Sequence, residues 1–350
     1  MNIDEIITQI KPADKNAIEK ARETQNNFIK PVGSLGELEN ISIKFAGITG
    51  KIFNHVQRKI IFLFGADHEI YNEGVATAPQ IFTRELMKIY ASTQNAGINI
   101  LAKQAGAELK LFDLGIKDFK NFDNVDFSLK YLENGTANFL TQEAMTLNIA
   151  QKYIQAGFNL IEQYKNQGFN LFGMGEVGMS NTTPATACIM AAAENFNPDL
   201  IGRGAGLSDE ALNLKRNVIL KALNFHQDNI SKSPVHIISC VGGAEIAAMT
   251  GLFLGAGFFR VPVIVDGITS IAAALITYKL YPDIRDYIFL SNKSPEPAYE
   301  IAAEILNLNA PLNLKMRLGE GTACAMMMPV IESALEIMNN MRSFKNDGNL

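Results

Sequence analysis

A glycine-rich segment that contains one acid is the first place where this sequence could do chemistry. Leu171–Ala187 reads LFGMGEVGMSNTTPATA, and its start matches the pattern Gly-x-Gly-x-x-Gly at Gly173, Gly175 and Gly178. Glycines at this spacing let a backbone approach phosphate closely, and the N-terminus of a following helix offers free N–H groups. The segment fits a dinucleotide-binding loop or a phosphate site of another kind, with Glu176 as a candidate catalytic acid.

Similar loops, rich in glycine and charged residues, recur along the chain. They lie at Gly65–His68, Asp113–Gly115, Gly202–Gly206, Val241–Glu245, Asp266–Gly267 and Arg317–Thr322, with a polar loop at Ser291–Ser294. Most of them follow an apolar run, and in an open parallel sheet the carboxyl ends of the strands converge on one ligand-binding crevice. Any single loop could be an ordinary tight turn. Together they predict a phosphorylated ligand and catalytic carboxylates.

The dinucleotide interpretation fails on its context. Such a site needs a second strand after the helix, with an acid at its end about 20 residues beyond the glycines. Here the helical stretch ATACIMAAAENF is followed by NPDLIGRGAG, which contains no strand, so Asp199 lies in a loop. In addition, Glu176 inside the turn would repel a pyrophosphate. A nicotinamide-dependent dehydrogenase is therefore not favoured.

Six apolar runs predict the strands that would bring these loops together. They lie at Lys59–Phe64, Leu109–Asp113, Phe169–Phe172, Val235–Cys240, Pro262–Val265 and Tyr287–Leu290. The runs are continuous rather than alternating, which is typical of strands buried on both faces of a parallel sheet. Longer helical stretches separate them. We expect βαβ crossovers and a doubly wound, mostly parallel six-stranded α/β fold of the Rossmann-like class.

Both ends of the chain are predicted to be helical. Asn16–Phe28 spaces its apolar residues as a helix does. Ser34–Glu37 has a capping-box pattern, which would begin a second helix at Leu35. Met326–Met341 is rich in Met, Leu, Ile and Val, with Pro329 near its start, and predicts a C-terminal helix.

The length and composition indicate a globular protein with a large core. The chain has 350 residues, of which 47% are hydrophobic and 19% charged, enough for one large α/β domain or two smaller ones. We expect residues 50–325 to form the α/β catalytic domain. Residues 1–49 and 326–350 would then form a small helical subdomain that packs on it.

Charge and cysteine usage narrow the class of protein further. The net charge of −5 and the absence of Lys/Arg runs argue against nucleic acid as a partner. No stretch is apolar enough to span a bilayer, and the N-terminus lacks a signal-peptide pattern. Cys188, Cys240 and Cys324 suit free thiols in a reducing compartment, and the four histidines show no zinc-ligand spacing. We expect a cytoplasmic protein without a metal or cofactor.

Nine segments taken together resemble one enzyme family. The quoted stretches are KPVGSLGELE (Lys30–Glu39), GADH to EGVATAPQ (Gly65–Gln80), AGINILA (Ala96–Ala102), NGTAN to EAMT (Asn134–Thr146), GMGEVGMSNTTPATA (Gly173–Ala187), GRGAGLSDE (Gly202–Glu210), GGAEIAAMTG (Gly242–Gly251), VPVIVDGITSIAAAL (Val261–Leu275) and RLGEGTACA (Arg317–Ala325). In this order they resemble the nicotinate-nucleotide:dimethylbenzimidazole phosphoribosyltransferases of cobalamin biosynthesis. GEVGMSNTTPA and RLGEGT are the most specific of them.

The resemblance implies a reaction between two small molecules. Phosphoribose would pass from nicotinate mononucleotide to a nitrogen of 5,6-dimethylbenzimidazole or a related base, releasing nicotinate and an α-riboside 5′-phosphate. The family's catalytic carboxylate falls on Glu320, which would remove the azole proton, and a positioned base typically contributes about 10²–10⁴-fold. Glu176 falls on a second acid, which would either stabilise positive charge at C1′ or cap its own loop. The resemblance also implies a homodimer.

The remaining candidate residues are assigned by their places in these loops. Contacts to the ribose and phosphate are expected from Gly175, Gly178, Ser180, Asn181, Ser291, Gly319 and Gly321. Arg317 would either bind the phosphate or anchor its own loop to a structural acid. Asp67 and Asp266 are expected to shape the crevice.

Four positions depart from the family's usual pattern. Ala76 stands where the family usually has Ser and Arg84 where it has Gln, and by resemblance both line the acceptor-base pocket. Because a hydroxyl is lost and a cation gained there, adenine, another azole or a phenolic ring remain open as acceptors. Asn292 and Tyr299 stand where His is common. A non-catalytic nucleotide-binding subunit is the other alternative.

Overall fold

A parallel sheet forms the centre of the protein. The computed structural model describes residues 1–344, and in this range six parallel strands lie in the order β3-β2-β1-β4-β5-β6. Their bounds are β1 Lys59–Gly65, β2 Glu108–Asp113, β3 Val125–Asp126, β4 Leu171–Val177, β5 Val263–Val265 and β6 Ile288–Leu290. Each strand pairs in parallel with its neighbour. The predicted doubly wound α/β fold is confirmed.

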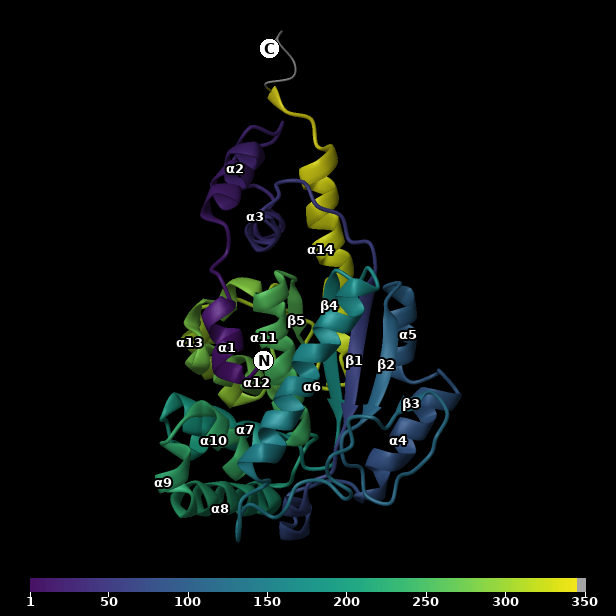
Figure 1. The fold of residues 1–350 in the computed structure, drawn as a ribbon, viewed down its shortest axis with the longest axis vertical. Coiled ribbons are helices and arrows are strands. Elements are labelled where there is room, and N and C mark those ends of the chain that lie inside the picture. Colours follow the sequence, from purple (N-terminus) through teal and green to yellow (C-terminus); the bar gives the residue numbers. More distant parts are fainter. Residues whose placement is uncertain (345–350) are drawn as a thin grey trace.

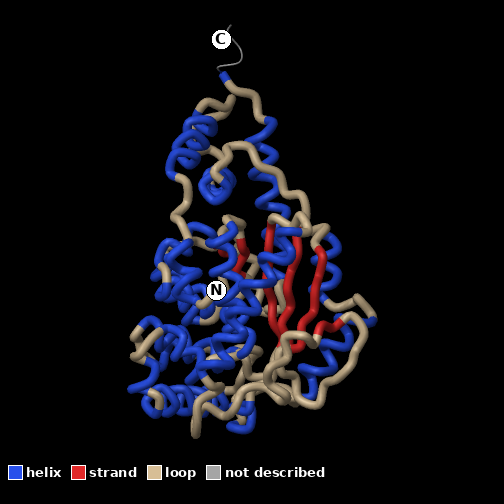
Figure 2. Tube along the Cα trace, viewed as in Figure 1, coloured by secondary structure: helices blue, strands red, loops and turns tan. Residues whose placement is uncertain are grey.

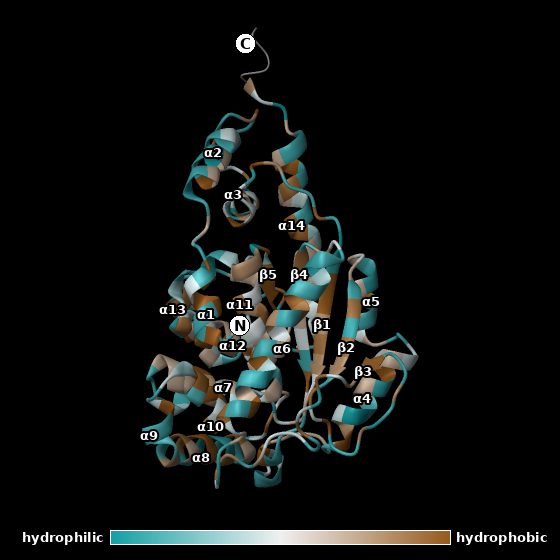
Figure 3. Cartoon of the chain, in the orientation of Figure 1, coloured by the Kyte–Doolittle hydropathy of each residue, from teal (hydrophilic) through white to brown (hydrophobic). Residues whose placement is uncertain are grey.

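Helices cover both faces of this sheet (Figure 1 and Figure 2). Their bounds are α1 Ile3–Gln9, α2 Lys15–Asn26, α3 Glu37–Thr49, α4 Ile81–Ser92, α5 Gly97–Gln104, α6 Leu147–Asn166, α7 Thr182–Ala193, α8 Asp209–Phe225, α9 Gln227–Ile230, α10 Pro234–Val241, α11 Ala244–Phe259, α12 Ile268–Leu280, α13 Pro297–Leu306 and α14 Thr322–Asn340. Short 3₁₀ turns lie at η1 Glu69–Glu73, η2 Pro198–Leu200 and η3 Pro282–Tyr287. In Figure 3 the central strands are brown, and teal gathers on outward helix faces such as that of α6.

The two faces of the sheet bury side chains of different size. On one face Phe62 of β1 packs edge-on against Tyr164 of α6, with ring centroids 5.0 Å apart. On the other face β4 presents Gly173, where an added Cβ would lie only 2.9 Å from Cys324 Cβ of α14. Because side chains alternate between faces along a strand, the glycines of β4 leave room for α14 to lie close to the sheet.

The predicted strand at Val235–Cys240 is wrong, because this run forms the helix α10. Ser233 caps the helix by accepting a hydrogen bond from the His236 N–H, and Pro234 takes the first helical position, which suits proline. A continuous apolar run has no period that separates a buried strand from a buried helix. The sixth strand is instead β3, which has two half-buried residues and carries no strand pattern.

The N-terminal helices also differ in detail from the prediction. Helix α3 begins at Glu37 rather than Leu35, and its N-cap is Gly36, without a side-chain cap. The acid that orders this turn is Glu39, which accepts hydrogen bonds from Lys30 Nζ (2.7 Å) and the Leu35 N–H (3.0 Å). The predicted helices at Asn16–Phe28 and Met326–Met341 are confirmed as α2 and α14. Helix α14 begins earlier than expected, so Pro329 lies inside it.

A second, smaller apolar cluster joins the two ends of the chain. It lies between α2, α3 and the C-terminal end of α14, and its buried members are Ala21, Phe28, Ile43, Ala46 and Met338. Helix α1 instead buries Ile6 in the main core. These contacts support a helical subdomain built from both ends. The proposed boundaries at residues 50 and 325 stay a prediction, and residues 345–350 lie outside the described range.

Helices α6 and α11 pack so closely that their backbones touch through glycine. A Cβ at Gly157 would lie 1.9 Å from the Ala248 carbonyl oxygen, and a Cβ at Gly251 would lie 1.8 Å from the Ile154 carbonyl oxygen. Real Cβ atoms do not approach backbone atoms this closely. Any side chain at either position must therefore push the two helices apart.

We expect Gly157→Ala to lower the free energy of unfolding by about 1–3 kcal/mol, because overpacking a close contact costs this much. Urea denaturation followed by circular dichroism would measure the change. The exposed Gln151 lies on the same helix, and Gln151→Ala serves as the control, with an expected change within about 0.5 kcal/mol. Equal effects of the two substitutions would contradict the packing argument.

Candidate active site

A cavity of about 270 Å³ opens at the carboxyl ends of β1 and β4. From these two adjacent strands the sheet is built outward in opposite directions, so the loops that leave them diverge and form a crevice. Loops after β1, β4, β5 and β6 line the cavity, together with the segments 203–207 and 316–323. Of the loops that the sequence singled out, those after β4, β5 and β6 and those at Gly202–Gly206 and Arg317–Thr322 are brought together, whereas no residue of Gly65–His68, Asp113–Gly115 or Val241–Glu245 lines the cavity.

Most of the predicted site residues lie on this cavity. They are Ala76, Glu176, Gly178, Ser180, Asn181, Asp266, Arg317, Gly319 and Glu320. The cavity lining does not include Asp67, Arg84, Gly175, Ser291 and Gly321. These five lie behind or beside the wall, and the contacts of each show what it does there.

Helix α14 begins where the Asp266 carboxylate meets its first backbone N–H groups. Asp266 follows β5 and accepts hydrogen bonds from Gly321 N (3.0 Å) and Ala323 N (2.8 Å). It also accepts a longer bond from Cys324 N (3.4 Å). An acid in this place satisfies orphan N–H groups and complements the helix dipole. Burial raises the pKa of Asp266 to about 6 in spite of these bonds, so the carboxylate is ionised at neutral pH.

The position of Glu320 follows from this cap, because Glu320 directly precedes the helix. Glu320 itself has a positive φ of 63°, and Gly319 and Gly321 on either side have φ of 80° and 82°. A turn with three such residues in a row suits glycine at the flanking positions. The turn therefore lifts the Glu320 side chain out of the helix and places it on the cavity wall.

Gly175 and Gly321 make room for this turn, and their contact with the ribose phosphate stays a prediction. A Cβ at Gly175 would lie 2.2 Å from the Glu320 carbonyl carbon, and a Cβ at Gly321 would lie 2.7 Å from Ile61 Cγ2. The turn therefore lies directly on strands β1 and β4. Both glycines were expected at the phosphate. In the structure they provide the space that lets Glu320 approach the sheet.

Ser291 and Asp67 also hold the wall from behind. The buried Ser291 hydroxyl donates to the Val265 carbonyl oxygen (2.6 Å), so it ties β6 to the end of β5. Asp67 accepts hydrogen bonds from the Thr83 hydroxyl (2.8 Å) and from Lys117 N (3.0 Å). The role expected of Asp67 in shaping the crevice agrees with these bonds, whereas Ser291 has its hydroxyl turned away from the cavity.

Glu320 has the electrostatic surroundings of a general base. Burial raises its pKa above the ordinary value of 4.5, and the buried Tyr90 hydroxyl, which has no other partner within residues 1–344, opposes part of this rise. Tyr90 lies on α4 and is 2% exposed. A carboxylate with a raised pKa is a stronger base that is still ionised near neutral pH. Tyr90 is a functional residue that the sequence did not indicate, since an apolar helix face gives no sign of a distant partner.

Glu176 is a second acid with a different environment. Its carboxylate accepts a hydrogen bond from the Asn181 side-chain amide. It also lies against Gly319, where an added Cβ would be 2.9 Å from Glu176 Oε1. Burial raises the pKa of Glu176 well above its ordinary value, and the charges of Glu245, Asp266 and Glu320 raise it further. So many acids in one place favour a ligand that brings positive charge.

The N-terminus of α7 and a buried lysine form the part of the site that suits an anion. Helix α7 begins after Asn181, and its N-cap has no side-chain hydrogen bond. The Thr183 N–H donates to the Ser180 carbonyl oxygen (2.8 Å) and Pro184 has no N–H, so the first turn favours an anion mainly through the helix dipole. Beside it, Lys215 Nζ donates to Thr182 Oγ1 (2.8 Å) and to the Gly202 carbonyl oxygen (3.2 Å). Burial lowers the pKa of Lys215 to about 8, which Glu296 partly opposes.

Lys215 was not identified from the sequence. The signal that could have found it is its place on the apolar face of α8, where Leu212 and Ile219 are buried at helical spacing. A lysine in such a stripe must have its charge balanced, so it indicates either a buried acid or an anionic ligand.

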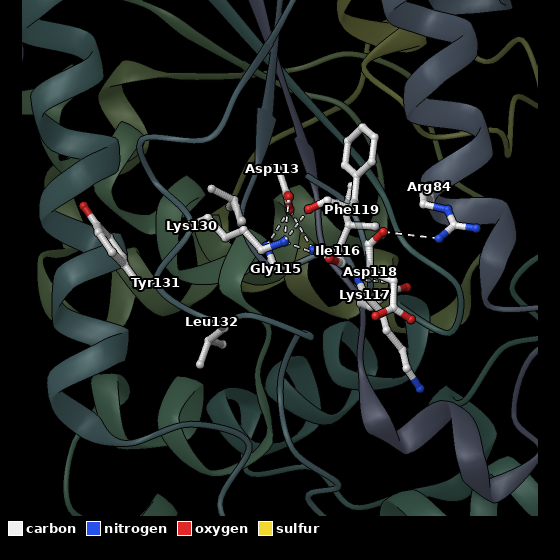
Figure 4. Close-up of polar contacts among 12 residues, drawn as sticks. Arg84, Asp113, Gly115, Ile116, Lys117, Asp118, Phe119, Lys130, Tyr131 and Leu132 are labelled. Atoms are coloured by element: carbon white, nitrogen blue, oxygen red, sulfur yellow. Dashed lines mark hydrogen bonds and ion pairs between the residues drawn. The ribbon is translucent and has the colours of Figure 1, made fainter. Parts of the chain in front are cut away.

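The two arginines predicted for the site lie at different distances from it. Arg317 is exposed on the cavity wall and donates to the Ala205 carbonyl oxygen (3.4 Å), so it bridges two glycine-rich loops. Arg84 is not brought into the cavity. Its guanidinium donates to Glu85 Oε1 (3.1 Å) and to the Asp118 carbonyl oxygen (3.2 Å), beside the loop that Asp113 and Lys130 order (Figure 4). The α4 residue that does line the cavity is Leu86.

Of the departures at Asn292 and Tyr299, the first lines the cavity and the second does not. Asn292 accepts a hydrogen bond from Leu314 N (2.7 Å) and donates to the Lys293 carbonyl oxygen (2.9 Å), which fastens the loop after β6 to the segment before Glu320. Tyr299 on α13 is buried behind this loop. Neither substitution removes a charge from the acid cluster.

Comparison with known proteins gives the same answer as the motifs. A family described as phosphoribosyltransferase matches residues 10–348. A nicotinate-nucleotide–dimethylbenzimidazole phosphoribosyltransferase of Clostridium perfringens is 36% identical over 348 residues, which covers 99% of this chain and 95% of that protein. The chain belongs to this family. A further member, from Geobacter sulfurreducens, is 36% identical over 344 residues, with 98% and 97% of the two chains covered.

A crystal structure from the family agrees with the fold. The enzyme of Thermus thermophilus superposes with a TM-score of 0.88 at 28% identity, over 96% of this chain and 98% of that one. Within residues 1–344 of the present family member, no helix is long and apolar enough to cross a membrane. The same residues contain no cluster of three or more His, Cys, Asp or Glu side chains arranged to hold a metal ion.

Glu320 must be deprotonated to act as a base, so its raised pKa predicts an acid limit of activity above the ordinary range of glutamate. We expect Tyr90→Phe to move this limit to still higher pH, because the hydroxyl that lowers the Glu320 pKa is lost. The measurement is kcat/KM for phosphoribosyl transfer over about pH 4–8. An acid limit that is the same in Tyr90→Phe and the wild type would show that Tyr90 does not lower the pKa of Glu320.

Asp266→Asn tests the cap that positions Glu320. An amide accepts fewer of these bonds, so we expect the free energy of unfolding to fall by about 1–3 kcal/mol. We also expect kcat to fall by about 100-fold, since a small displacement of a catalytic group costs this much. The exposed Asp228 provides the control Asp228→Asn, which should change neither quantity. Unchanged kcat in Asp266→Asn would show that Glu320 is positioned in another way.

Proposed function

We propose that this protein transfers phosphoribose from nicotinate mononucleotide to a nitrogen of 5,6-dimethylbenzimidazole or a related base, in nucleotide loop assembly of cobalamin. The products are nicotinate and an α-riboside 5′-phosphate. The observation that carries the proposal is the Glu320 carboxylate, which is held on the cavity wall with a raised pKa, in a chain of this family.

The donor phosphate fits the anion-binding end of the cavity. The dipole of α7 favours a dianion at the start of this helix. Lys215 lies behind the same turn and supplies the positive charge through Thr182 and the Gly202 loop. Gly178 and Ser180 line the path between this end and the acids. We therefore assign the phosphate to the turn from Gly178 to Thr182.

The donor ring fits the acid cluster. Nicotinate joined to ribose is a pyridinium, so the bond that breaks is next to a positive charge. Glu176 and Glu320 line the cavity, and Asp266 adds negative charge behind them. This arrangement stabilises a cationic donor and positive charge that develops at C1′ as the bond breaks. A carboxylate such as Glu176 gains most from that charge in its ionised form, which the bound cation would favour.

The reaction requires one proton transfer. The azole nitrogen forms a bond to C1′ while the bond from C1′ to the pyridinium nitrogen breaks, and nicotinate leaves with that electron pair. Glu320 takes the proton from the azole N–H, which otherwise makes the nitrogen a poor nucleophile. The leaving group is a neutral pyridine nitrogen and needs no proton. Attack from the face opposite the nicotinate inverts C1′ and gives the α product.

The acceptor end of the cavity is mostly apolar. Val75, Ala76, Leu86 and Leu318 line it around Glu320, with Thr77 as a polar neighbour. An apolar slot accepts flat rings and discriminates weakly among them, by about 1–3 kcal/mol per methylene. Ala76 offers no hydroxyl to a ring substituent. Related azoles, adenine and phenolic rings therefore remain acceptors to be tested beside dimethylbenzimidazole.

The setting proposed for this reaction follows from the family resemblance and the composition. We propose a homodimer that acts in the cytoplasm on small-molecule substrates, without a metal or cofactor. Exposed apolar side chains on α4 near the cavity, Ile81 and Phe82, are 50% and 48% exposed and offer a contact surface for a second copy. Sedimentation of the purified protein would measure the oligomeric state.

Nicotinate release tests the reaction directly. We expect the wild type to release nicotinate from nicotinate mononucleotide only when an acceptor base is present. Glu320→Gln should bind the donor but react about 10²–10⁴-fold more slowly, since the positioned base is lost. The exposed Glu304 provides the control Glu304→Gln, which should leave the rate unchanged. Chromatography of nicotinate and of the riboside phosphate would follow both products.

An acceptor screen separates the alternatives. Dimethylbenzimidazole, benzimidazole, adenine and a phenol would be compared by kcat/KM, and Ala76→Ser would show whether a hydroxyl narrows the choice. The absence of nicotinate release with every acceptor would overturn the proposal. Nucleotide binding with the same negligible turnover in the wild type and Glu320→Gln would instead favour a non-catalytic subunit.

A further inference from the structure

A buried histidine and a buried glutamate lie beneath the active site and take no part in the reaction above. His68 follows β1, Glu245 lies in the first turn of α11, and each side chain is 1% exposed. His68 Nε2 lies 3.4 Å from Glu245 Oε1. Within residues 1–344 neither Glu245 oxygen has a hydrogen-bond partner. A carboxylate buried in this way needs a counter-charge, and the imidazole is the group in place to provide it.

The His68 ring supports the turn between β4 and α7. A Cβ at Gly178 would lie 3.6 Å from His68 Nε2, so the ring lies against the backbone of this cavity-lining glycine. The neighbouring Asp67 reaches the same turn through the Thr83 hydroxyl, which accepts a hydrogen bond from Met179 N (3.1 Å). Asp67 and His68, in the loop after β1, thus both lie against the turn to which we assign the donor phosphate.

The other ring nitrogen fixes the orientation of His68. His68 Nδ1 lies 3.0 Å from the Thr136 hydroxyl. The Thr136 backbone also bonds to the residues on both sides, since its N–H donates to the Asp67 carbonyl oxygen (3.0 Å) and its carbonyl accepts from Glu69 N (2.8 Å). The ring is therefore held so that Nε2 faces Glu245 from α11.

Two acids, Glu245 and Asp67, act directly on the charge of this ring, and a third acts on Glu245. Asp67 precedes it, Glu245 faces it from α11, and Glu176 of β4 interacts with Glu245. Burial lowers the pKa of His68, but the Glu245 and Asp67 carboxylates more than offset this, so the pKa lies above the ordinary 6.5. The contribution of the pair to stability is therefore complete below about pH 6.5 and is lost as pH rises through the raised pKa.

We propose that the His68–Glu245 ion pair is a positioning element of the active site, which holds the β4–α7 turn in its substrate-binding geometry only while His68 is protonated. Neither side chain lines the cavity, so both act through Gly178 and the loop after β1. Loss of the proton leaves the Glu245 carboxylate without a counter-charge beneath this turn. The activity readout of this inference rests on the proposed function.

The first test is the alkaline side of the pH profile. We expect kcat/KM for nicotinate mononucleotide to fall as His68 loses its proton. Glu245→Gln should move this fall about 1–3 pH units lower, since an opposite charge at this distance shifts a pKa by that much. In His68→Gln the part of this fall that belongs to His68 should be absent, and the highest value of kcat/KM should be lower than in the wild type. Lys215, with a pKa of about 8, also titrates in this range, but its step should not respond to Glu245→Gln.

The second test needs no turnover. Nuclear magnetic resonance of ¹⁵N-labelled imidazoles would follow the titration of His68 in the wild type and in Glu245→Gln. A lower midpoint in the variant supports the pair, even if no acceptor is found. The matched control is Glu336→Gln, which removes the acid from the exposed pair of Glu336 with His55 (4.0 Å) and should leave the His68 midpoint in place.

Two results would overturn the proposal. One is a His68 midpoint that is the same in the wild type and Glu245→Gln. The other is a shifted midpoint with no change in the alkaline side of kcat/KM. If a single variant fails to fold, the double variant His68→Gln with Glu245→Gln replaces the ion pair by two neutral amides. The double variant should fold, and its kcat/KM should show no alkaline fall from His68. If that fall remained, the proposed role of the ion pair would be contradicted.

Discussion

The contact between the Asp266 carboxylate and the first N–H groups of α14 determines the geometry of the whole site. It joins the end of a central strand to the start of a helix that lies on the sheet, and Glu320 is the residue at the junction. Gly175 and Gly321 are needed because this junction must lie directly on β1 and β4. The catalytic base is therefore placed by covalent attachment to a capped helix, and its side chain needs few contacts of its own.

The same cap brings like charges close together, and a cationic substrate would balance them. Asp266 is a third buried acid close to Glu176 and Glu320. The negative charges of Asp266 and Glu320 raise the pKa of Glu176, and the charge of Glu320 raises the pKa of Asp266. In the proposed reaction a cationic pyridinium riboside would relieve this repulsion where its glycosidic bond breaks, with its phosphate at the end of the cavity near α7 and Lys215. Repulsion among the three acids is unfavourable in the unliganded site, and the positive charge of the donor would reduce it.

The sequence predicts those features that depend on local pattern. The loop around Glu320 is visible as an acid between glycines, but the role of Glu320 as the base is implied by the family resemblance of RLGEGT. Gly175 shows that a small residue is required, but the sequence does not distinguish the close approach of a ligand from the close approach of another backbone. Val235–Cys240 is a continuous apolar run without helical or alternating periodicity, so the sequence predicts a strand where the structure has a helix. Lys215 and Tyr90 depend on partners far away in the chain, which only the folded structure brings to them.

Helix α14 has a mechanical consequence beyond its first turn. Its 19 residues span about 28 Å, from the cavity to the small cluster where Met338 meets α2 and α3 (Figure 1). One continuous helix therefore connects the two places, and Pro329, which has no N–H to donate to the helix, lies between them. The packing of α2 and α3 against Met338 thus helps to fix the helix that begins beside Glu320, the proposed base, at the opposite end.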